Sequence, residues 1–207
     1  GDVVMLLLGV NIVVGPLLTF MIFAPGKKSL RFDLAVIVLL QLGALTYGLW
    51  TVAAGRPAWL VFNTDRVDLV QANDVDHRKI LLAEQDYRMA PWTGPRWVST
   101  RLPRDVEEQN TVTLEAVFSG LDYPQRPEFY QPLSLAADSI RRHALPLEEL
   151  QRYNPADAVA SIRARWPQAD AFLPMMAREK PMTVLIKRET ASVIAVVDLP
   201  QFLGDLI

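Results

Sequence analysis

The chain has 207 residues, of which 51% are hydrophobic and none is cysteine, and its formal net charge at pH 7 is -2. A chain without cysteine forms no disulfide and no thiolate metal site, and a near-neutral charge provides no basic surface for nucleic acid. The apolar residues are concentrated in the first quarter. Residues 56–207 therefore read as a mixed, charged domain that is long enough to build its own core.

Two long apolar runs, residues 3–23 and 34–54, flank a short polar stretch. Each run has about the 20 residues that a helix needs to cross the hydrocarbon of a bilayer. We therefore expect a transmembrane helical hairpin over residues 1–55. Tyr47 and Trp50 fall near one end of the second run, where amphipathic rings collect at the membrane surface.

The turn between the runs predicts the topology. Lys27, Lys28 and Arg31 put positive charge there, and such charge stays in the cytoplasm. Residues 56–207 are then expected in the periplasm of a bacterium, with the protein as a multi-pass component of the inner membrane. Gly1 would also lie outside the cytoplasm, which requires a further span upstream or a cleaved signal, and we expect the further span.

Each apolar run carries small and polar residues along one helical face. Membrane helices use such faces to approach each other closely and to form hydrogen bonds. Two interpretations are open: the two faces pack on each other, or part of this surface receives a membrane helix of another protein. The residues concerned are Asn11, Gly15, Thr19, Gln41, Ala44 and Gly48.

The segment after the membrane exit is rich in strand signals. Residues 58–63 favour a strand, and residues 66–71 alternate polar and apolar side chains. Thr64-Asp65 between them indicates a turn, so we expect an N-terminal β-hairpin. A helix is expected over residues 75–88, with Ile80, Leu81 and Tyr87 buried.

A turn-rich loop with two indoles follows. A loop that presents tryptophan can be a binding platform, or its rings can cap the domain core. The candidate contact residues of this loop are Trp92, Arg96 and Trp97.

The rest of the domain alternates between helices and strands. A helix is expected to begin at about Pro103 and end near residue 118, and shorter helical pieces follow up to residue 166. Residues 182–188 and 192–198 predict a closing β-hairpin. The fold class is therefore a membrane helical hairpin plus an α+β domain. That domain has a small, mainly antiparallel sheet of about four strands, packed with helices from the middle of the chain.

The sequence shows no catalytic motif. His77 and His143 are far apart and lack metal-ligand spacing, and the chain has neither a Gly-x-Ser-x-Gly elbow nor a glycine-rich phosphate loop. The acidic pair at residues 107–108 lies near a predicted helix start, where it favours the helix dipole. We expect no catalysis, no metal and no cofactor, and a role in binding or assembly.

Several stretches together resemble the type IV pilin accessory proteins of the bacterial inner membrane, the TfpX/TfpZ group. The resemblance is dense from residue 6 to residue 74, with Gly15-Pro16 inside a span, then Pro25-Gly26-Lys27-Lys28-Ser29-Leu30 and Arg31-Phe32-Asp33. It continues through residues 91–96 and 184–199, and it is thin over residues 121–181. The family has a further N-terminal span, and no enzymatic residue carries over from it.

The resemblance implies a helper of type IV pilus assembly that binds its cognate pilin before the subunit is incorporated. The six small and polar residues of the spans would then include the intramembrane contacts. Other expected partners are further pilus assembly proteins and membrane lipid. Three alternatives stay open: a scaffold component of the pilus machinery, a membrane-anchored ligand sensor, and an enzyme that modifies pilin or a lipid-linked sugar.

Overall fold

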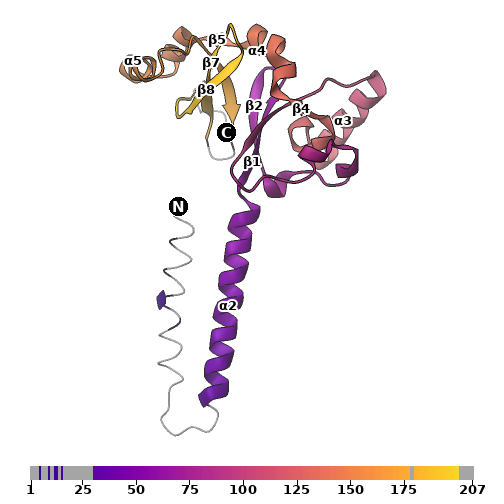
Figure 1. Ribbon diagram of the computed structural model, residues 1–207, viewed down its shortest axis with the longest axis vertical. Coiled ribbons are helices and arrows are strands. Elements are labelled where there is room, and N and C mark those ends of the chain that lie inside the picture. The colour runs from indigo at the N-terminus through magenta and orange to yellow at the C-terminus, as the bar shows by residue number, and fades with distance from the viewer. Residues whose placement is uncertain are drawn as a thin grey trace. The chain divides into compact units, whose positions relative to one another are not determined.

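The computed structural model describes residues 30–177 and 180–200, together with positions 5, 9, 12, 13 and 15. The chain divides into two compact units, Gly1–Arg56 and Pro57–Ile207. The first contains the long helix α2 and the second contains the sheet (Figure 1).

Helix α2, Leu30–Ala54, confirms the helix expected from the second apolar run. Its segment Phe32–Ala54 is long and apolar enough to cross a membrane, and it is the one such helix among the described residues. Large apolar side chains such as Leu39 and Leu40 are about 70% exposed on it, as a lipid-facing helix requires. These features are consistent with a membrane-anchored protein.

The hairpin itself stays a prediction. Most of the first run, including Asn11 and Thr19, lies outside the described residues, as do Lys27, Lys28 and the side chain of Arg31.

The second unit is built on a curled mixed sheet that has eight strands among the described residues. The strand order is β4-β3-β1-β2-β6-β7-β8, and β5 also pairs with β6. The strands are β1 Pro57–Asn63, β2 Arg66–Gln71, β3 Arg96–Thr100, β4 Tyr130–Pro132, β5 Leu145–Pro146, β6 Ala171–Met176, β7 Met182–Lys187 and β8 Ser192–Val197.

The two predicted hairpins are confirmed as the antiparallel pairs β1–β2 and β7–β8. The expectation of about four strands was wrong, because β3, β4, β5 and β6 also belong to the sheet. Of these, β3 and β6 pair parallel to their neighbours β1 and β2. Strand β6 joins the two hairpins into one sheet. Its Pro174 and the polar residues of β3 hide both strands from a pattern search.

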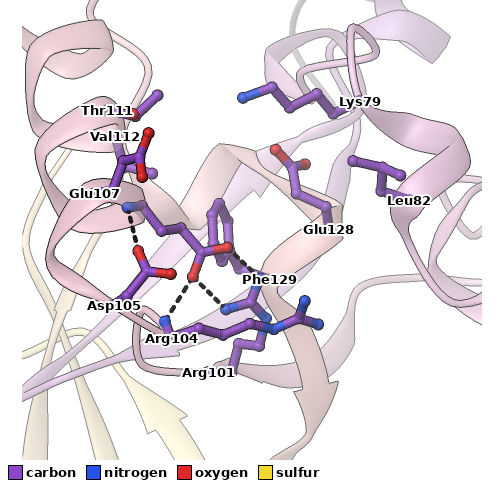
Figure 2. Close-up of a pocket in the computed structure, with 11 residues that line it drawn as sticks. Lys79, Leu82, Arg101, Arg104, Asp105, Glu107, Thr111, Val112, Glu128 and Phe129 are labelled. Atoms are coloured by element: carbon purple, nitrogen blue, oxygen red, sulfur yellow. Dashed lines mark hydrogen bonds and ion pairs between the residues drawn. The ribbon is translucent and has the colours of Figure 1, made fainter.

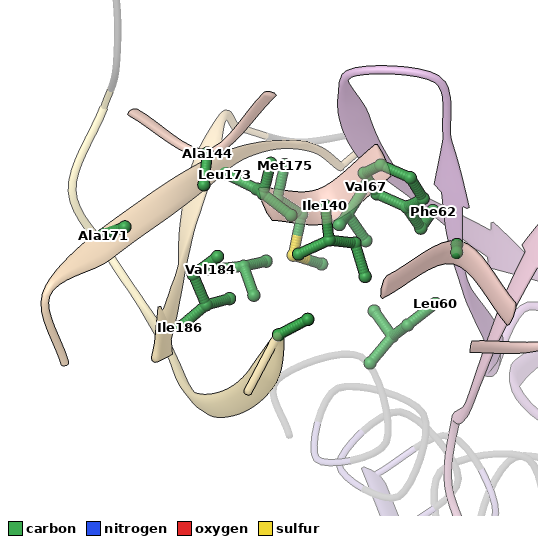
Figure 3. Packing of buried hydrophobic residues seen from close by; sticks show 12 residues of the cluster. Leu60, Phe62, Val67, Ile140, Ala144, Ala171, Leu173, Met175, Val184 and Ile186 are labelled. Carbon is green, nitrogen blue, oxygen red and sulfur yellow. The ribbon is translucent and has the colours of Figure 1, made fainter. Parts of the chain in front are cut away.

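The central strands are buried on both faces, which explains the unbroken apolar run in β1. On one face Leu60, Phe62 and Val67 pack with Leu173 and with Ile140 of helix α4, Ala137–His143 (Figure 3).

On the other face, Trp59 of β1 meets Tyr87 and Tyr130 edge to face, with ring centroids 5.9 and 5.4 Å from its own. Helix α5, Ala156–Arg165, packs through Val159 on the β7–β8 end of the sheet.

The helix expected over residues 75–88 is absent. The chain instead forms short 3-10 helices, η1 Ala72–Asp74, η2 Ile80–Leu82 and η3 Gln85–Tyr87. The Asp76 side chain accepts hydrogen bonds from the Arg78 backbone and guanidinium, and such local bonds compete with a helix. Tyr87 is buried as expected, but Leu81 is 77% exposed.

Candidate binding surface

Helix α3, Val106–Ser119, confirms the expected helix and has well-defined ends. The carboxylate of Asp105 accepts a 2.7 Å hydrogen bond from the backbone N–H of Glu108, and Gly120 ends the helix with a φ of 68°. Val112 on its inner side is only 2% exposed. The helix is therefore fixed to the domain along one face.

The outer face of α3 exposes several large apolar side chains, with Asn110 and Glu107 between them. Four large side chains on it are 58–84% exposed and fall within an arc of about 120° at 100° per residue. They are Val106, Leu114, Val117 and Phe118. We call these four residues the α3 outer face. Single exposed apolar side chains are common, but four on one side of a helix make that side a candidate binding surface.

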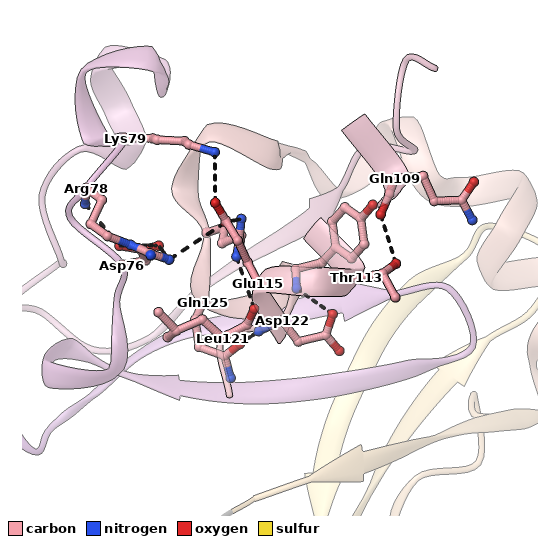
Figure 4. Close-up of polar contacts among 11 residues, drawn as sticks. Asp76, Arg78, Lys79, Gln109, Thr113, Glu115, Leu121, Asp122 and Gln125 are labelled. Atoms are coloured by element: carbon pink, nitrogen blue, oxygen red, sulfur yellow. Dashed lines mark hydrogen bonds and ion pairs between the residues drawn. The ribbon is translucent and has the colours of Figure 1, made fainter. Parts of the chain in front are cut away.

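A charge network holds α3 against the rest of the domain (Figure 4). Arg126 is fully buried, and its Nη1 lies 2.5 Å from Oε2 of Glu115 on the helix. Lys79 Nζ lies 3.6 Å and Arg78 Nη2 lies 3.8 Å from the same carboxylate. Burial alone raises the pKa of Glu115, but the hydrogen bond and charge of Arg126 outweigh it, so the pKa is lowered.

A cleft of about 480 Å³ lies between α3 and the short helices beside it (Figure 2). On the α3 side Glu108 accepts hydrogen bonds of 2.8 and 2.7 Å from the guanidinium of Arg101. These bonds hold the pKa of Glu108 at about 2, well below its usual 4.5.

Lys79 and Glu128 point into this cleft from the side opposite α3. Both carboxylate oxygens of Glu128 are shielded from water, and burial raises its pKa. The lining therefore mixes both charge signs. No group of three His, Cys, Asp or Glu side chains in the described part of the chain could hold a metal ion.

A second cleft, of about 540 Å³, contains Ser139 and His143, which lie in contact near the end of α4. His143 Nδ1 lies 2.9 Å from the backbone oxygen of Ser139 and 3.3 Å from its Oγ. The shorter contact requires the proton on Nδ1, so that nitrogen cannot accept the hydroxyl proton. The pair therefore has no geometry for activating a nucleophile.

The three loop residues singled out from the sequence have different surroundings. Trp92 is 71% exposed, whereas Trp97 is half-buried and packs against the core. Arg96 donates a 3.3 Å hydrogen bond to the backbone oxygen of Asp86. Adjacent strand residues point to opposite faces, which separates Arg96 from Trp97.

Within α2 the predicted small face is partly shifted. Gly48 is buried and Gln41 is half-buried, but Ala44 is exposed, and Leu45 instead shares the buried side. A Cβ placed on Gly15 would lie 2.6 Å from Gln41 Nε2, so these two positions do approach closely.

The sequence analysis missed the α3 outer face. A usable signal was present, because the apolar residues of this helix spread over both of its sides, whereas a surface helix needs only one apolar stripe.

Comparison with known proteins relates the chain to fimbrial assembly. It is 27% identical over 205 residues to a fimbrial assembly protein, serogroup E1, of Dichelobacter nodosus, and the match covers 95% of this chain and 79% of that protein. It is 30% identical over 146 residues to the serogroup I protein, covering 70% of this chain and 56% of that protein.

A third Dichelobacter nodosus protein, the fimbrial assembly protein of serogroups C1 and C2, is 33% identical over 72 residues. That match covers 34% of this chain and 55% of the relative. No protein-family model and no solved structure matches the chain. The similarities support a role in fimbrial assembly.

Proposed function

We propose that this protein is an accessory factor of type IV fimbrial biogenesis that binds its cognate pilin in the membrane before the subunit enters the fibre. The observation that carries the proposal is the similarity to a fimbrial assembly protein over 95% of the chain. The resemblance to pilin accessory proteins favours pilin binding as the specific role within fimbrial assembly. In this proposal the protein is not an enzyme.

A pilin in the inner membrane has an embedded apolar helix and a globular head outside, so its partner needs two contact surfaces. The α3 outer face is suited to the head, because its apolar side chains are solvent-exposed on a helix that is held rigidly by Glu115 and Arg126. Removing apolar side chains from water is the main favourable contribution to most protein–protein association.

The second surface belongs to α2. A shallow hollow on its exposed side is lined by Leu39, Leu42, Gly43, Thr46, Tyr47 and Trp50. A Cβ on Gly43 would meet no heavy atom within 4 Å, so the hollow is open where a neighbouring helix could approach. Gly48, in contrast, is buried.

Crosslinked pull-down from native membranes tests the proposal, with the captured proteins identified by mass spectrometry. Enrichment of one pilin over other abundant membrane proteins supports pilin binding. Enrichment of motor or alignment components without pilin contradicts it and favours the scaffold function.

Two leucine substitutions test the exposed and the buried face of α2 independently. Gly43→Leu fills the open hollow and should lower pilin capture with the protein still folded and inserted. Gly48→Leu instead perturbs a buried position and should lower the stability of the span. Unchanged pilin capture by both variants would remove the span from the proposed interface.

A further inference from the structure

Few residues separate the candidate membrane span from the first strand of the sheet along the chain. Strand β1 begins at Pro57, and only Gly55 and Arg56 separate it from the end of α2 at Ala54. Three Cα–Cα steps reach at most about 11 Å. The exposed rings of Tyr47 and Trp50 mark the last turns of the helix as the segment that lies at the headgroup level. The start of β1 is therefore within reach of the lipid headgroups.

The strand register identifies what else lies at this end of the sheet. Pro57 pairs with Gln71 at the end of β2, and Trp59 pairs with Arg96 at the start of β3. The connection between those strands, residues 72–95, thus leaves and re-enters the sheet at the end where β1 begins. Strand β6 does not reach this end of the sheet: its last residue, Met176, pairs with Asp68, whereas β2 continues to Gln71.

The part of this connection just before β3 exposes two large apolar side chains. Met89 is 75% and Trp92 is 71% exposed. The same segment is anchored from within by Tyr87, which is 6% exposed and packs edge to face on Trp59 in β1. The loop that carries Trp92 is therefore anchored to the domain core at Tyr87.

The backbone of the loop is also restricted. Pro91 and Pro95 fix their own φ angles, and Gly94 has a φ of 117°, which favours glycine. Arg88 donates 2.9 Å hydrogen bonds to the backbone oxygens of Ala83 and Leu81. The shape of the loop is thus held by local bonds before any partner is present.

We propose that the loop of residues 88–96 is a lipid-contact site, in which Trp92 and Met89 enter the headgroup region and fix the domain against the bilayer surface. Tryptophan is favoured at this depth because its ring is apolar and its N–H is polar. The loop carries Arg88 and Arg96, and Glu84 and Asp86 lie just before it, so the formal charge over residues 84–96 is zero. The contact is therefore apolar and should depend little on lipid charge. The inference is independent of pilin binding.

The absence of native cysteine makes a direct test possible. Thr93→Cys in the exposed loop carries an environment-sensitive dye in the full chain, reconstituted in bilayers of phosphatidylethanolamine and phosphatidylglycerol with a headgroup-level quencher. Glu189→Cys is the matched control. It follows β7 at the opposite end of the sheet, about nine strand residues or about 30 Å away along the register.

The proposal predicts quenching of the dye at position 93 several-fold above that at position 189. It also predicts that Met89→Ser with Trp92→Ser brings position 93 down to the control value, and that pure phosphatidylcholine bilayers give the same pattern. Equal quenching at the two positions in the parent protein would overturn the proposal. So would quenching at position 93 that is unaffected by the double substitution.

Discussion

The ion pair between Glu115 and Arg126 offers the sharpest test of how α3 is held. Glu115→Gln removes the charge that lies 2.5 Å from a guanidinium with no exposed surface. Breaking a buried pair by removing one partner costs about 3–5 kcal/mol. The Glu115 side chain is 29% exposed, and water reduces the effect there, so we expect a loss of about 2–3 kcal/mol.

For a chain of this size the loss corresponds to a melting temperature lower by about 5–10 °C. Near-UV circular dichroism of the full chain in detergent micelles measures it, because this signal reports aromatic packing and not the helicity of α2. Glu107→Gln is the matched control, since Glu107 lies on the same helix and is exposed. Equal melting temperatures for the two variants would refute the argument that this network fixes α3.

Three further predictions follow from the same helix and cleft. The pKa of Glu108 is about 2 in the folded chain and about 4.5 in the unfolded chain, so its contribution to the free energy of unfolding is present above pH 4.5 and is lost as pH falls toward 2. Glu108→Gln should remove about 1–2 kcal/mol of this pH-dependent stability, which a series of melting temperatures between pH 2 and pH 6 measures. The pKa of Glu128 is raised, so its ionisation destabilises the fold, and Glu128→Gln should stabilise by about 1 kcal/mol at neutral pH and not at pH below 4 in the same scan. Phe118→Asp should lower pilin co-purification about tenfold with a stability change within about 0.5 kcal/mol, because the ring is 84% exposed, while Gln109→Asp on the same helix should leave capture unchanged.

Local patterns predicted the elements whose residues carry their own signal. Alternation in β2 and the apolar run in β1 were sufficient for the first hairpin, and the helix signals near Asp105 and Gly120 gave α3 to within a few residues. The length of the second apolar run gave α2.

The rest depends on contacts between distant parts of the chain. Strand β3 is recognisable only beside β1, and β6 joins the sheet by pairing that spans more than a hundred residues from β2. The predicted helix at residues 75–88 fails because Asp76 is used by Arg78 and by Gln125, a partner far along the sequence.

The candidate site shows the same division. Exposure of Trp92 fits a binding loop, but burial of Trp97 depends on which face of β3 it occupies. Predicting the α3 outer face requires knowing that the side of the helix with Val112 is the buried one. The sequence does not decide this, because apolar residues occur on both sides of the helix.

The central claim is that the α3 outer face binds pilin. A photo-reactive amino acid at Val117, which is 75% exposed, tests it most directly in cells that produce the cognate pilin, with position 168 in the exposed turn before β6 as the control. The account predicts a pilin adduct from position 117 and none from position 168. Pilin adducts of equal yield from both positions, or none from position 117 in cells where pilin is abundant, would contradict it.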